Sequence, residues 1–365
     1  MLSIIYLNTA SPSLHTLIGD TCMGMLPCYG RYRVLDFILS NCSHAKLSHI
    51  SIIANHPSWK LTHYISNSSD WHIMPPNGNI TFLPALNMHT QNNLIQQLTN
   101  CIDYIDFYKP KYVLLLSGNQ TYTMDYRRIL SFHDKNNADV TMGVINVPWE
   151  KAARYTTVCA NTHNKVTHLD LSLRFTENNT ISMGVYVFNW HVLKKHLTHY
   201  TLPAAYPNNC FGDILTYNML NDEYRIMSYP FSGDWHDITT IQDFWHVHMH
   251  TLKQQHFLKT QKIYKYTHTK KLPLCATFID SRASIKNVIV GDGCSILGDV
   301  KDAIIFSGVH IKKDAFVENA IVMPDNHVDK YQYISKCILL NPIHKKTGYT
   351  LRIFPVQNDI THHII

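Results

Sequence analysis

A small polar turn follows one of the most apolar segments of the chain, at the place where an open α/β sheet usually presents a catalytic carboxylate. The segment Tyr112–Leu116 reads YVLLL, and the turn Ser117-Gly118-Asn119 comes directly after it. A carboxylate at the end of such a strand can hold a divalent cation against the phosphates of a nucleotide. Asn119 has a carbonyl that accepts hydrogen bonds, but it brings no negative charge. The turn therefore predicts an enzyme-like α/β scaffold from which one metal ligand is missing.

Twenty-four histidines raise the question of a different metal site. The densest group is His246, His248 and His250, whose first and last members lie one turn apart on the same face of a helix. No carboxylate completes a His-Glu-x-x-His pattern, so we expect a solvated helix face here. The pair His362 and His363 near the C-terminus is a weaker candidate. We predict no metal site in this chain.

Composition excludes several classes of protein. The nine cysteines form no Cys-x-x-Cys pair and are odd in number, so we expect reduced, mostly buried thiols. The net charge of +6 comes without a dense basic block, which argues against a nucleic-acid partner. No segment approaches the about 20 apolar residues that span a bilayer, and the N-terminus lacks the features of a secretory signal. We expect a cytoplasmic protein that binds no membrane.

The first two-thirds of the chain alternates short apolar runs with polar helical stretches. The runs expected to be strands are Ser3–Leu7, His49–Ala54, Tyr112–Leu116 and Val140–Val147. The expected helices between them include Val34–Cys42 and Asn93–Tyr108. Strands spaced by helices predict a mostly parallel sheet that is covered on both faces.

After about residue 265 the pattern changes to aliphatic residues at a six-residue step. These residues are Ile279 and Ile285, then Val290 and Ile296, then Ile305, Ile311, Val317 and Met323. The step predicts triangular coils of a parallel β-helix, on which His310 is a solvated turn residue. The alternative is a small antiparallel sheet, because the spacing slips by one residue between Ile285 and Val290. We expect an α/β domain over residues 1–260, a connector over 261–277 and a β-helix domain over 278–365.

Several segments in order carry a resemblance to one family. The longest is Gly30–Asn41, which reads GRYRVLDFILSN. It is followed by Trp71, Ser182–Phe188, Phe211–Leu215 and Gly233–Ile238. This series resembles the bacterial glucose-1-phosphate adenylyltransferases, the ADP-glucose pyrophosphorylases of glycogen synthesis. The resemblance implies a Rossmann-like nucleotidyltransferase domain followed by a left-handed parallel β-helix of hexapeptide repeats.

The same resemblance shows where the chain departs from the catalytic pattern. The segment Asn8–His15 lacks the family's glycine-rich phosphate loop and contains Pro12, which has no amide donor. Met23 stands where the family has a lysine that offsets the leaving pyrophosphate. The nucleotide-contact block is replaced by Thr90–Leu94, and Asn178 aligns with the lysine that binds the sugar phosphate.

The resemblance also implies a pair of Mg²⁺ ligands, of which one is lost and one is retained. Asn119 stands at the first position and Asp237 at the second. With its partner gone, Asp237 is expected to serve as a carboxylate at the N-terminus of a helix that begins near Thr239. Asp125 lies six residues beyond Asn119, and a capping role is expected for it. Adenylyl transfer depends on positioning and charge neutralisation, so efficient autonomous turnover is not expected.

A family scaffold with a dismantled nucleotide loop resembles the GlgD-type subunit that accompanies a catalytic GlgC-type subunit. This resemblance implies a noncatalytic, regulatory member of a heterotetramer, without a cofactor of its own, whose catalytic partner holds the Mg²⁺. One alternative is a weakly active nucleotidyltransferase that uses Asp237 and Asp125. Another is a stand-alone sensor that binds a sugar phosphate or nucleotide without turnover.

The block Arg31-Tyr32-Arg33 is intact although the phosphate loop is not. In the family this segment lies near subunit contacts and the effector region. Arg31, Tyr32 and Arg33 are therefore candidates for an interface or for binding a phosphorylated metabolite. A structural alternative is an ion pair between Arg33 and Asp36, three residues apart.

Overall fold

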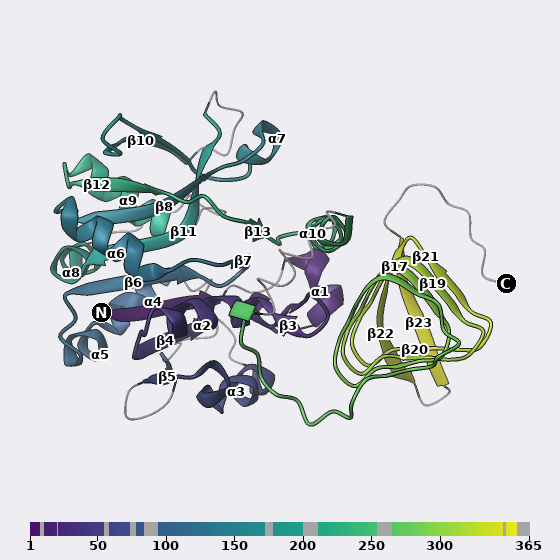
Figure 1. Cartoon of the computed structure of the whole chain (residues 1–365). Coiled ribbons are helices and arrows are strands. Elements are labelled where there is room, and N and C mark those ends of the chain that lie inside the picture. Colours follow the sequence, from purple (N-terminus) through teal and green to yellow (C-terminus); the bar gives the residue numbers. More distant parts are fainter. Residues whose placement is uncertain are drawn as a thin grey trace.

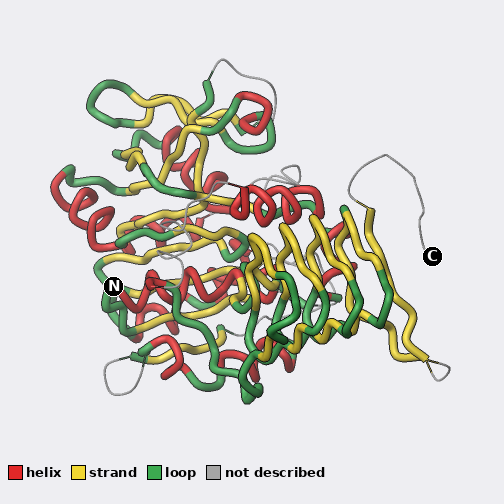
Figure 2. Tube along the Cα trace, turned by 45° about the vertical axis from the view of Figure 1, so that its right-hand side comes forward, coloured by secondary structure: helices red, strands yellow, loops and turns green. Residues whose placement is uncertain are grey.

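The computed structural model of this protein describes residues 1–7, 11–19, 21–54, 58–73, 78–83, 94–171, 178–199, 211–253, 265–345 and 348–355. Figure 1 shows an N-terminal α/β domain beside a C-terminal stack of coils that outline a triangle. Figure 2 shows the coils edge-on, with their strands stacked in parallel rows. Within the part of the chain that is described, no helix is long and apolar enough to cross a membrane.

A mostly parallel sheet forms the centre of the N-terminal domain. Its strands are β1 (Leu2–Leu7), β4 (His49–Ala54), β5 (Asn79–Phe82), β6 (Tyr112–Ser117), β8 (Val140–Asn146), β11 (Thr180–Asn189) and β12 (Ile226–Pro230). The order is β12-β8-β11-β6-β1-β4-β5, and β11 runs antiparallel to both of its neighbours. β9 (Thr157–Ala160) and β10 (Val166–Asp170) extend the sheet beside β11. The four predicted strands are all present.

Helices cover both faces of this sheet, as predicted. Ile5 and Leu7 of β1 belong to the apolar cluster under α2 (Val34–His44), α3 (Trp59–Ile65) and α6 (Tyr126–Lys135). Leu2, Ile4 and Tyr6 belong to the cluster under α4 (Leu94–Asn100), α5 (Ile102–Phe107), α8 (Trp190–His199) and α9 (Phe211–Asn221). This alternation follows the period of two residues along a strand. The single helix predicted over residues 93–108 is instead two helices, because the chain breaks its helical conformation at Cys101.

Short elements complete the domain. They are α1 (Pro12–Ile18), η1 (Met23–Met25), β2 (Pro27–Cys28), β3 (Tyr32–Arg33), η2 (Ser68–Trp71), β7 (Gln120–Tyr122), α7 (Trp149–Ala152), β13 (Trp235–Asp237) and α10 (Ile241–Lys253). β7 and β13 pair as an antiparallel ribbon, in which Gln120 lies opposite Asp237.

The C-terminal domain has the hexapeptide-repeat architecture that the six-residue step predicts. One face stacks β14 (Phe278–Ile279), β16 (Ser295–Ile296), β18 (His310–Ile311) and β20 (His327–Val328) in parallel. A second stacks β15 (Ile285–Val290), β17 (Asp299–Ile305), β19 (Phe316–Val322), β21 (Tyr333–Ser335) and β22 (Cys337–Lys345). This pairing rules out a small antiparallel sheet for the coils. Only the last pair, β22 with β23 (Gly348–Pro355), is antiparallel among the strands that the structure describes here.

Most of the predicted aliphatic residues lie in one of two cores, but Ile279 is 45% exposed, contrary to the prediction, and Ile285 and Val290 are only partly buried. Ile296, Ile305, Ile311 and Val317 fill the interior of the coils. Met323, which the same step placed inside, belongs instead to the cluster between the two domains. Neighbouring residues along a strand point to opposite faces, so a strand that packs on both sides contributes to both clusters.

The two domains share an apolar core. α1, η1 and α10 pack against the outer side of the coils through Leu14, Leu17, Met23, Phe244, Val247, Ile304, Phe306, Ile321, Met323 and Ile338. A backbone contact joins the domains as well: the Ser307 amide donates to the Gly30 carbonyl over 3.1 Å. Gly30 has a φ of +83°, and a Cβ at this position would lie 3.0 Å from Ile289 Cγ2. The close approach therefore favours glycine at this position.

The cysteines agree with the prediction of reduced thiols. Eight of the nine lie in the described residues, all eight are free, and six of them are buried. Burial raises the pKa of Cys22 to about 11. Buried cysteines with raised pKa values are unreactive packing residues.

Candidate functional site

The structure brings Asn119 and Asp237 together. Asn119 follows β6, and Asp237 ends β13 on the neighbouring ribbon. The Asn119 side-chain amide Nδ2 donates to Asp237 Oδ1 over 2.9 Å, and the Ser117 hydroxyl donates to Asn119 Oδ1. The Tyr155 hydroxyl donates to the second carboxylate oxygen of Asp237, also over 2.9 Å. Both oxygens of Asp237 are thus hydrogen-bonded by neutral side chains.

The environment of Asp237 is dry. The residue is 3% exposed, and burial raises the pKa of its carboxyl to about 6, although the Tyr155 hydroxyl and the Lys151 charge oppose that rise. Lys151 lies on α7 with its Nζ 5.0 Å from the centre of the Trp235 ring. Burial lowers the pKa of Lys151. Besides Asp237 itself, the nearby charged groups are Lys151 and the ion pair of Arg154 with Asp243, whose Nη2 and Oδ2 atoms lie 2.8 Å apart.

The residues at this site do not fit Mg²⁺. The ion takes oxygen ligands, with one or two carboxylates and several waters in octahedral geometry. Here the amide NH₂ group of Asn119 donates to Asp237 Oδ1, so a neutral donor occupies that oxygen. Among the residues that the structure describes, no group of three or more His, Cys, Asp or Glu side chains is placed to hold a metal.

Met23, for which the sequence resemblance predicts the position of a catalytic lysine, is a packing residue in the structure. It lies in η1, is 3% exposed and belongs to the interdomain cluster. A lysine here would have to lift its ammonium group out of that cluster, at a large desolvation cost.

Asn178 is tied into its own loop. Its Nδ2 donates to the Val158 carbonyl over 2.7 Å, and its Oδ1 accepts from the Thr180 amide over 2.9 Å. The side-chain amide of Asn178 is therefore hydrogen-bonded to the nearby backbone through both its nitrogen and its oxygen. Residues 8–10 of the altered phosphate loop, residues 90–93 of the nucleotide-contact block and residues 175–177 before Asn178 lie outside the described residues, as do His362 and His363.

Two aspartates have capping roles, one of them unexpected. Asp125 accepts from the Arg127 amide at the start of α6 over 3.1 Å, as predicted. The helix after Asp237 is capped by a different residue than predicted: Asp243 accepts from the Thr240 amide over 2.9 Å, and the Thr240 hydroxyl accepts from the Asp243 amide over 3.0 Å. This reciprocal pair is a capping box. Asp237 stays in β13 beside Asn119.

Arg33 and Tyr32 are structural residues in this conformation. Arg33 donates from its guanidinium to the Met25 carbonyl over 2.6 Å and lies over the Tyr64 ring, while its backbone amide donates to Asp36 over 2.8 Å. The contact with Asp36 is therefore made by the backbone instead of by the predicted side-chain ion pair. Tyr32 is 3% exposed and packs in the interdomain cluster.

Asp36 is the centre of a buried network that involves Trp71 and the connector. Its carboxylate accepts from the Tyr64 hydroxyl, the Trp71 indole and the Thr269 hydroxyl, at 2.9, 3.1 and 2.6 Å. Burial raises the pKa of Asp36 to about 6. The network fixes the connector segment around Thr269 against α2 and η2.

Arg31 reaches the second domain. Its Nε lies 3.4 Å from Asp292 Oδ2, and its side chain is about one-third exposed. The Arg31-Tyr32-Arg33 block thus lies at the boundary between the two domains, with Arg31 at its outer edge.

The histidine group on α10 differs from the prediction of a solvated face. His246 and His250 are exposed, but His248 is fully buried at the domain boundary. Its Nε2 accepts from the Tyr29 amide over 3.1 Å and its Nδ1 lies 2.7 Å from the Phe244 carbonyl, so the ring is neutral with the proton on Nδ1. Burial lowers the pKa of His248 to about 4.

Sequence reasoning missed two residues of the site. Tyr155 and Lys151 lie on or after α7 and carry no motif, so nothing in the sequence identifies them as neighbours of Asp237. Gly184 has a φ of +71°, and a Cβ there would lie 2.8 Å from Ser117 Cβ. Its place in the Ser182–Phe188 block favours a role in strand packing, and this close approach of β11 to β6 agrees with that role.

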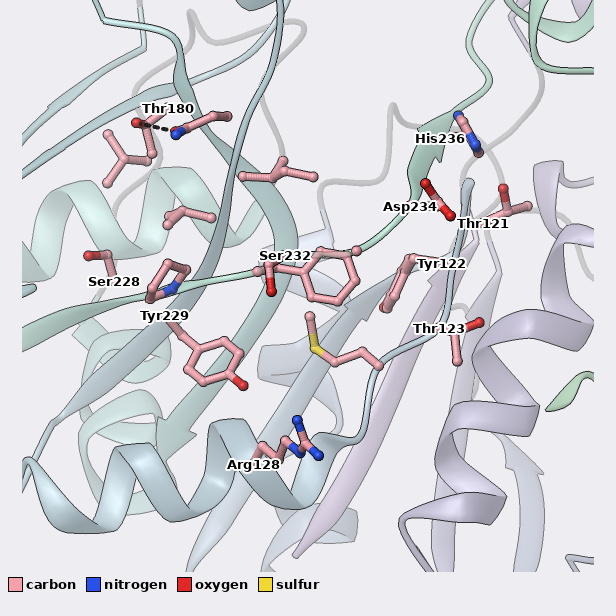
Figure 3. Close-up of a pocket in the computed structure, with 18 of the residues that line it drawn as sticks. Thr121, Tyr122, Thr123, Arg128, Thr180, Ser228, Tyr229, Ser232, Asp234 and His236 are labelled. Atoms are coloured by element: carbon pink, nitrogen blue, oxygen red, sulfur yellow. Dashed lines mark hydrogen bonds between the residues drawn. The ribbon is translucent and has the colours of Figure 1, made fainter. Parts of the chain in front are cut away.

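A separate cleft of about 1470 Å³ opens beside this site. It lies between α6 and the strands β8, β9, β12 and β13, and Figure 3 shows Arg128, Tyr229 and Ser232 around it. Asn178 lines it, whereas Asn119 and Asp237 do not.

Comparison with known proteins matches both domains. A nucleotidyl transferase family model matches residues 20–254, and a model for the GlmU-like C-terminal hexapeptide matches residues 275–351. The glucose-1-phosphate adenylyltransferase of Acetivibrio thermocellus is 33% identical over 350 residues, which cover 92% of this chain and 80% of that protein. The enzyme of the same name from Desulfitobacterium hafniense is 32% identical over 314 residues, with 85% and 79% covered. The one from Bacillus mycoides is 30% identical over 352 residues, with 93% and 91% covered.

Proposed function

Because this chain belongs to the glucose-1-phosphate adenylyltransferase family, we propose that it is a noncatalytic, regulatory subunit of such an enzyme, of the GlgD type. The reaction of the assembly is the conversion of ATP and glucose-1-phosphate to ADP-glucose and pyrophosphate in glycogen biosynthesis. In this proposal the chain acts through contact with a catalytic, GlgC-type subunit. That subunit supplies the Mg²⁺ site.

The hydrogen bond from Asn119 to Asp237 is the observation that carries the proposal. Attack of a glucose-1-phosphate oxygen on the α-phosphorus of ATP needs charge neutralisation more than covalent help from the protein. In this chain the carboxylate that remains is bound by an amide and a phenol. Met23 is neutral and adds no cation, and its side chain is enclosed in the interdomain core.

The retained scaffold also supports a role in assembly. The apolar core that joins the domains fixes the relative position of the sheet and the coils. Packed side chains of this kind can carry energetic coupling between a contact surface and a distant part of the chain. We propose a heterotetramer with the catalytic subunit, and Arg31 as the residue of the Arg31–Arg33 block placed to meet a phosphorylated metabolite. Arg33 is committed to Met25 and Tyr64.

Coexpression with a catalytic glucose-1-phosphate adenylyltransferase subunit from the same organism tests the proposal. We expect the two chains to copurify and the complex to have a higher kcat/KM, or an altered effector response, than the catalytic subunit alone. The matched control is the complex in which the catalytic subunit carries an inactivating substitution of its own metal-binding aspartate, which should have no activity. Failure to copurify together with unchanged kinetics would refute the regulatory role.

The contribution of Arg31 is tested in the same complex. Arg31→Ala should leave assembly intact and reduce the response of the complex to a phosphorylated metabolite. Asp292→Ala, which removes the partner of Arg31 without removing the cation, is the control. An effector response that Arg31→Ala does not change would exclude Arg31 from effector binding.

A further inference from the structure

The ribbon formed by β7 and β13 separates two different environments. Trp235 and Asp237 of β13 are buried with Asn119, whereas His236 between them lines the cleft on the other side. Side chains that alternate along a strand point to opposite faces. The cleft is therefore a second compartment behind the degenerate site.

The lining of the cleft is polar but carries little charge. Among the described residues that line it, Arg128 of α6 is the one permanent cation, and Asp125 and Asp234 are the carboxylates. Asp125 already accepts from the Arg127 guanidinium over 2.8 Å. Recognition of a polyphosphate takes several converging cations, so this lining disfavours a nucleotide.

Planar amides and aromatic rings are the main features of the lining. The amides are those of Asn146, Asn161, Asn164 and Asn178. Asn146 is exposed and accepts from the Thr180 hydroxyl through its Oδ1 over 2.7 Å, which restrains its side-chain amide. The rings of Tyr229 and Phe231 are half-buried in the wall. In Figure 3 the Tyr229 side chain from β12 and the Arg128 side chain from α6 project into the same part of the cleft.

Size adds to this chemistry. The volume of about 1470 Å³ exceeds the range of about 300–1,000 Å³ that is usual for sites of small ligands. The cleft therefore has room for a ligand larger than one sugar ring. Its described lining includes Tyr266, His250, Asn164 and Ser228.

We propose that the cleft binds an uncharged oligosaccharide. The apolar faces of its sugar rings lie against Tyr229 and Phe231, and its hydroxyl groups bind the amides of Asn146 and Asn164 and the guanidinium of Arg128. Neutral hydroxyl groups need many well-directed partners instead of strong charges, which is what these residues provide. The choice of an α-1,4-linked glucose chain as the first probe follows from the proposed function, since glycogen is such a polymer.

Calorimetric titration of the purified full-length chain with maltohexaose, cellohexaose and ATP tests the proposal. We expect one of the two neutral hexasaccharides to bind with a Kd of about 1 mM or tighter, and ATP not to compete for it. Tyr229→Ala should weaken binding by about tenfold or more, because it removes a ring face. Tyr229→Phe keeps that ring and should retain most of the affinity, which separates loss of the ring from a failure to fold.

The matched control is His310→Ala, an exposed position on the coils, which should bind as the unmodified chain does. Absence of binding by both hexasaccharides at about 10 mM would overturn the proposal. So would binding that Tyr229→Ala and Arg128→Ala leave unchanged, or competition by ATP. These titrations use no catalytic subunit, so their result is independent of whether the chain regulates one.

Discussion

The backbone amide of Tyr29 donates a hydrogen bond of 3.1 Å to Nε2 of His248, and this bond links the segment before the Arg31–Arg33 block to α10. The imidazole is enclosed by the Tyr29, Phe244 and Phe306 rings. Because Nδ1 faces the Phe244 carbonyl, the ring must be neutral for Nε2 to accept. The domain boundary is therefore built around an uncharged histidine.

Acid should weaken this boundary. The folded-state pKa of His248 is lowered to about 4 by burial, with the His236 charge adding to the effect, against 6.5 for an unperturbed imidazole. A histidine whose folded pKa is lowered stabilises the fold above about pH 6.5, and this contribution is lost as the pH falls toward 4. His248→Gln should remove about 1–3 kcal/mol of the pH-dependent change in unfolding free energy over that interval. Urea unfolding at pH 7 and pH 4.5 measures it, and an equal pH dependence in both proteins would contradict the assignment.

Gly291 should tolerate no side chain. A Cβ there would lie 2.4 Å from the Gly30 carbonyl oxygen and 2.5 Å from the Ser307 amide nitrogen, the two atoms that join the domains. Gly291→Ala should therefore cost about 2–4 kcal/mol of unfolding free energy and expose the connector to proteolysis. Asp292→Ala is the neighbouring control: it removes a half-exposed ion pair worth about 1 kcal/mol or less. Equal stability of the two variants would show that the backbone contact is unimportant.

Much of the architecture could be predicted from the sequence alone, because the spacing of apolar residues along the chain indicates which face of each helix or strand is buried. The strand predicted over His49–Ala54 has those bounds in the structure. The helix predicted over residues 93–108 is two helices, since periodicity does not detect a local break at Cys101. Met323 fits the six-residue step yet faces the other domain. A repeat identifies the apolar positions of a coil, but it does not indicate whether each side chain faces the interior of the coils or the other domain.

The site was only partly predictable for a similar reason. The sequence shows a neutral residue at position 119, where a carboxylate was expected, but the hydrogen bond of Asn119 to Asp237 joins residues 118 positions apart. Tyr155 binds Asp237 and Lys151 lies over the Trp235 ring, and both residues come from a segment without a motif. His248 was expected on a solvated face, because a helix of mixed composition does not reveal that a second domain covers one side.

Restoring the carboxylate should destabilise the fold without reviving chemistry. Asn119→Asp would place two carboxylates side by side in a partly dry site, and we expect a loss of about 1–3 kcal/mol at pH 8. The loss should shrink at pH 5, where a proton can be shared. Asn119→Ser, which keeps a donor, is the control. ADP-glucose formation by Asn119→Asp alone at rates near those of a catalytic subunit would show that the loop and lysine positions matter little.

A second buried acid gives an independent pH test. Asp213 of α9 is 2% exposed, accepts a hydrogen bond from the Tyr186 hydroxyl, and has its pKa raised to about 6 by burial. A carboxyl with a raised folded pKa stabilises the fold below its ordinary value of 3.8, and this contribution is lost as the pH rises through about 6. Asp213→Asn keeps the acceptor and removes the titration, so its unfolding free energy relative to the unmodified chain should rise between pH 4 and pH 8. A constant difference over that range would contradict the prediction.

The central claim is that this protomer does not carry out adenylyl transfer by itself. Its most direct test is pyrophosphate release from ATP and glucose-1-phosphate by the purified chain with saturating Mg²⁺ and no catalytic subunit. The account predicts a rate equal to that of the Asp237→Ala variant and of a blank without protein. A rate comparable to that of a catalytic glucose-1-phosphate adenylyltransferase, abolished by Asp237→Ala, would contradict it.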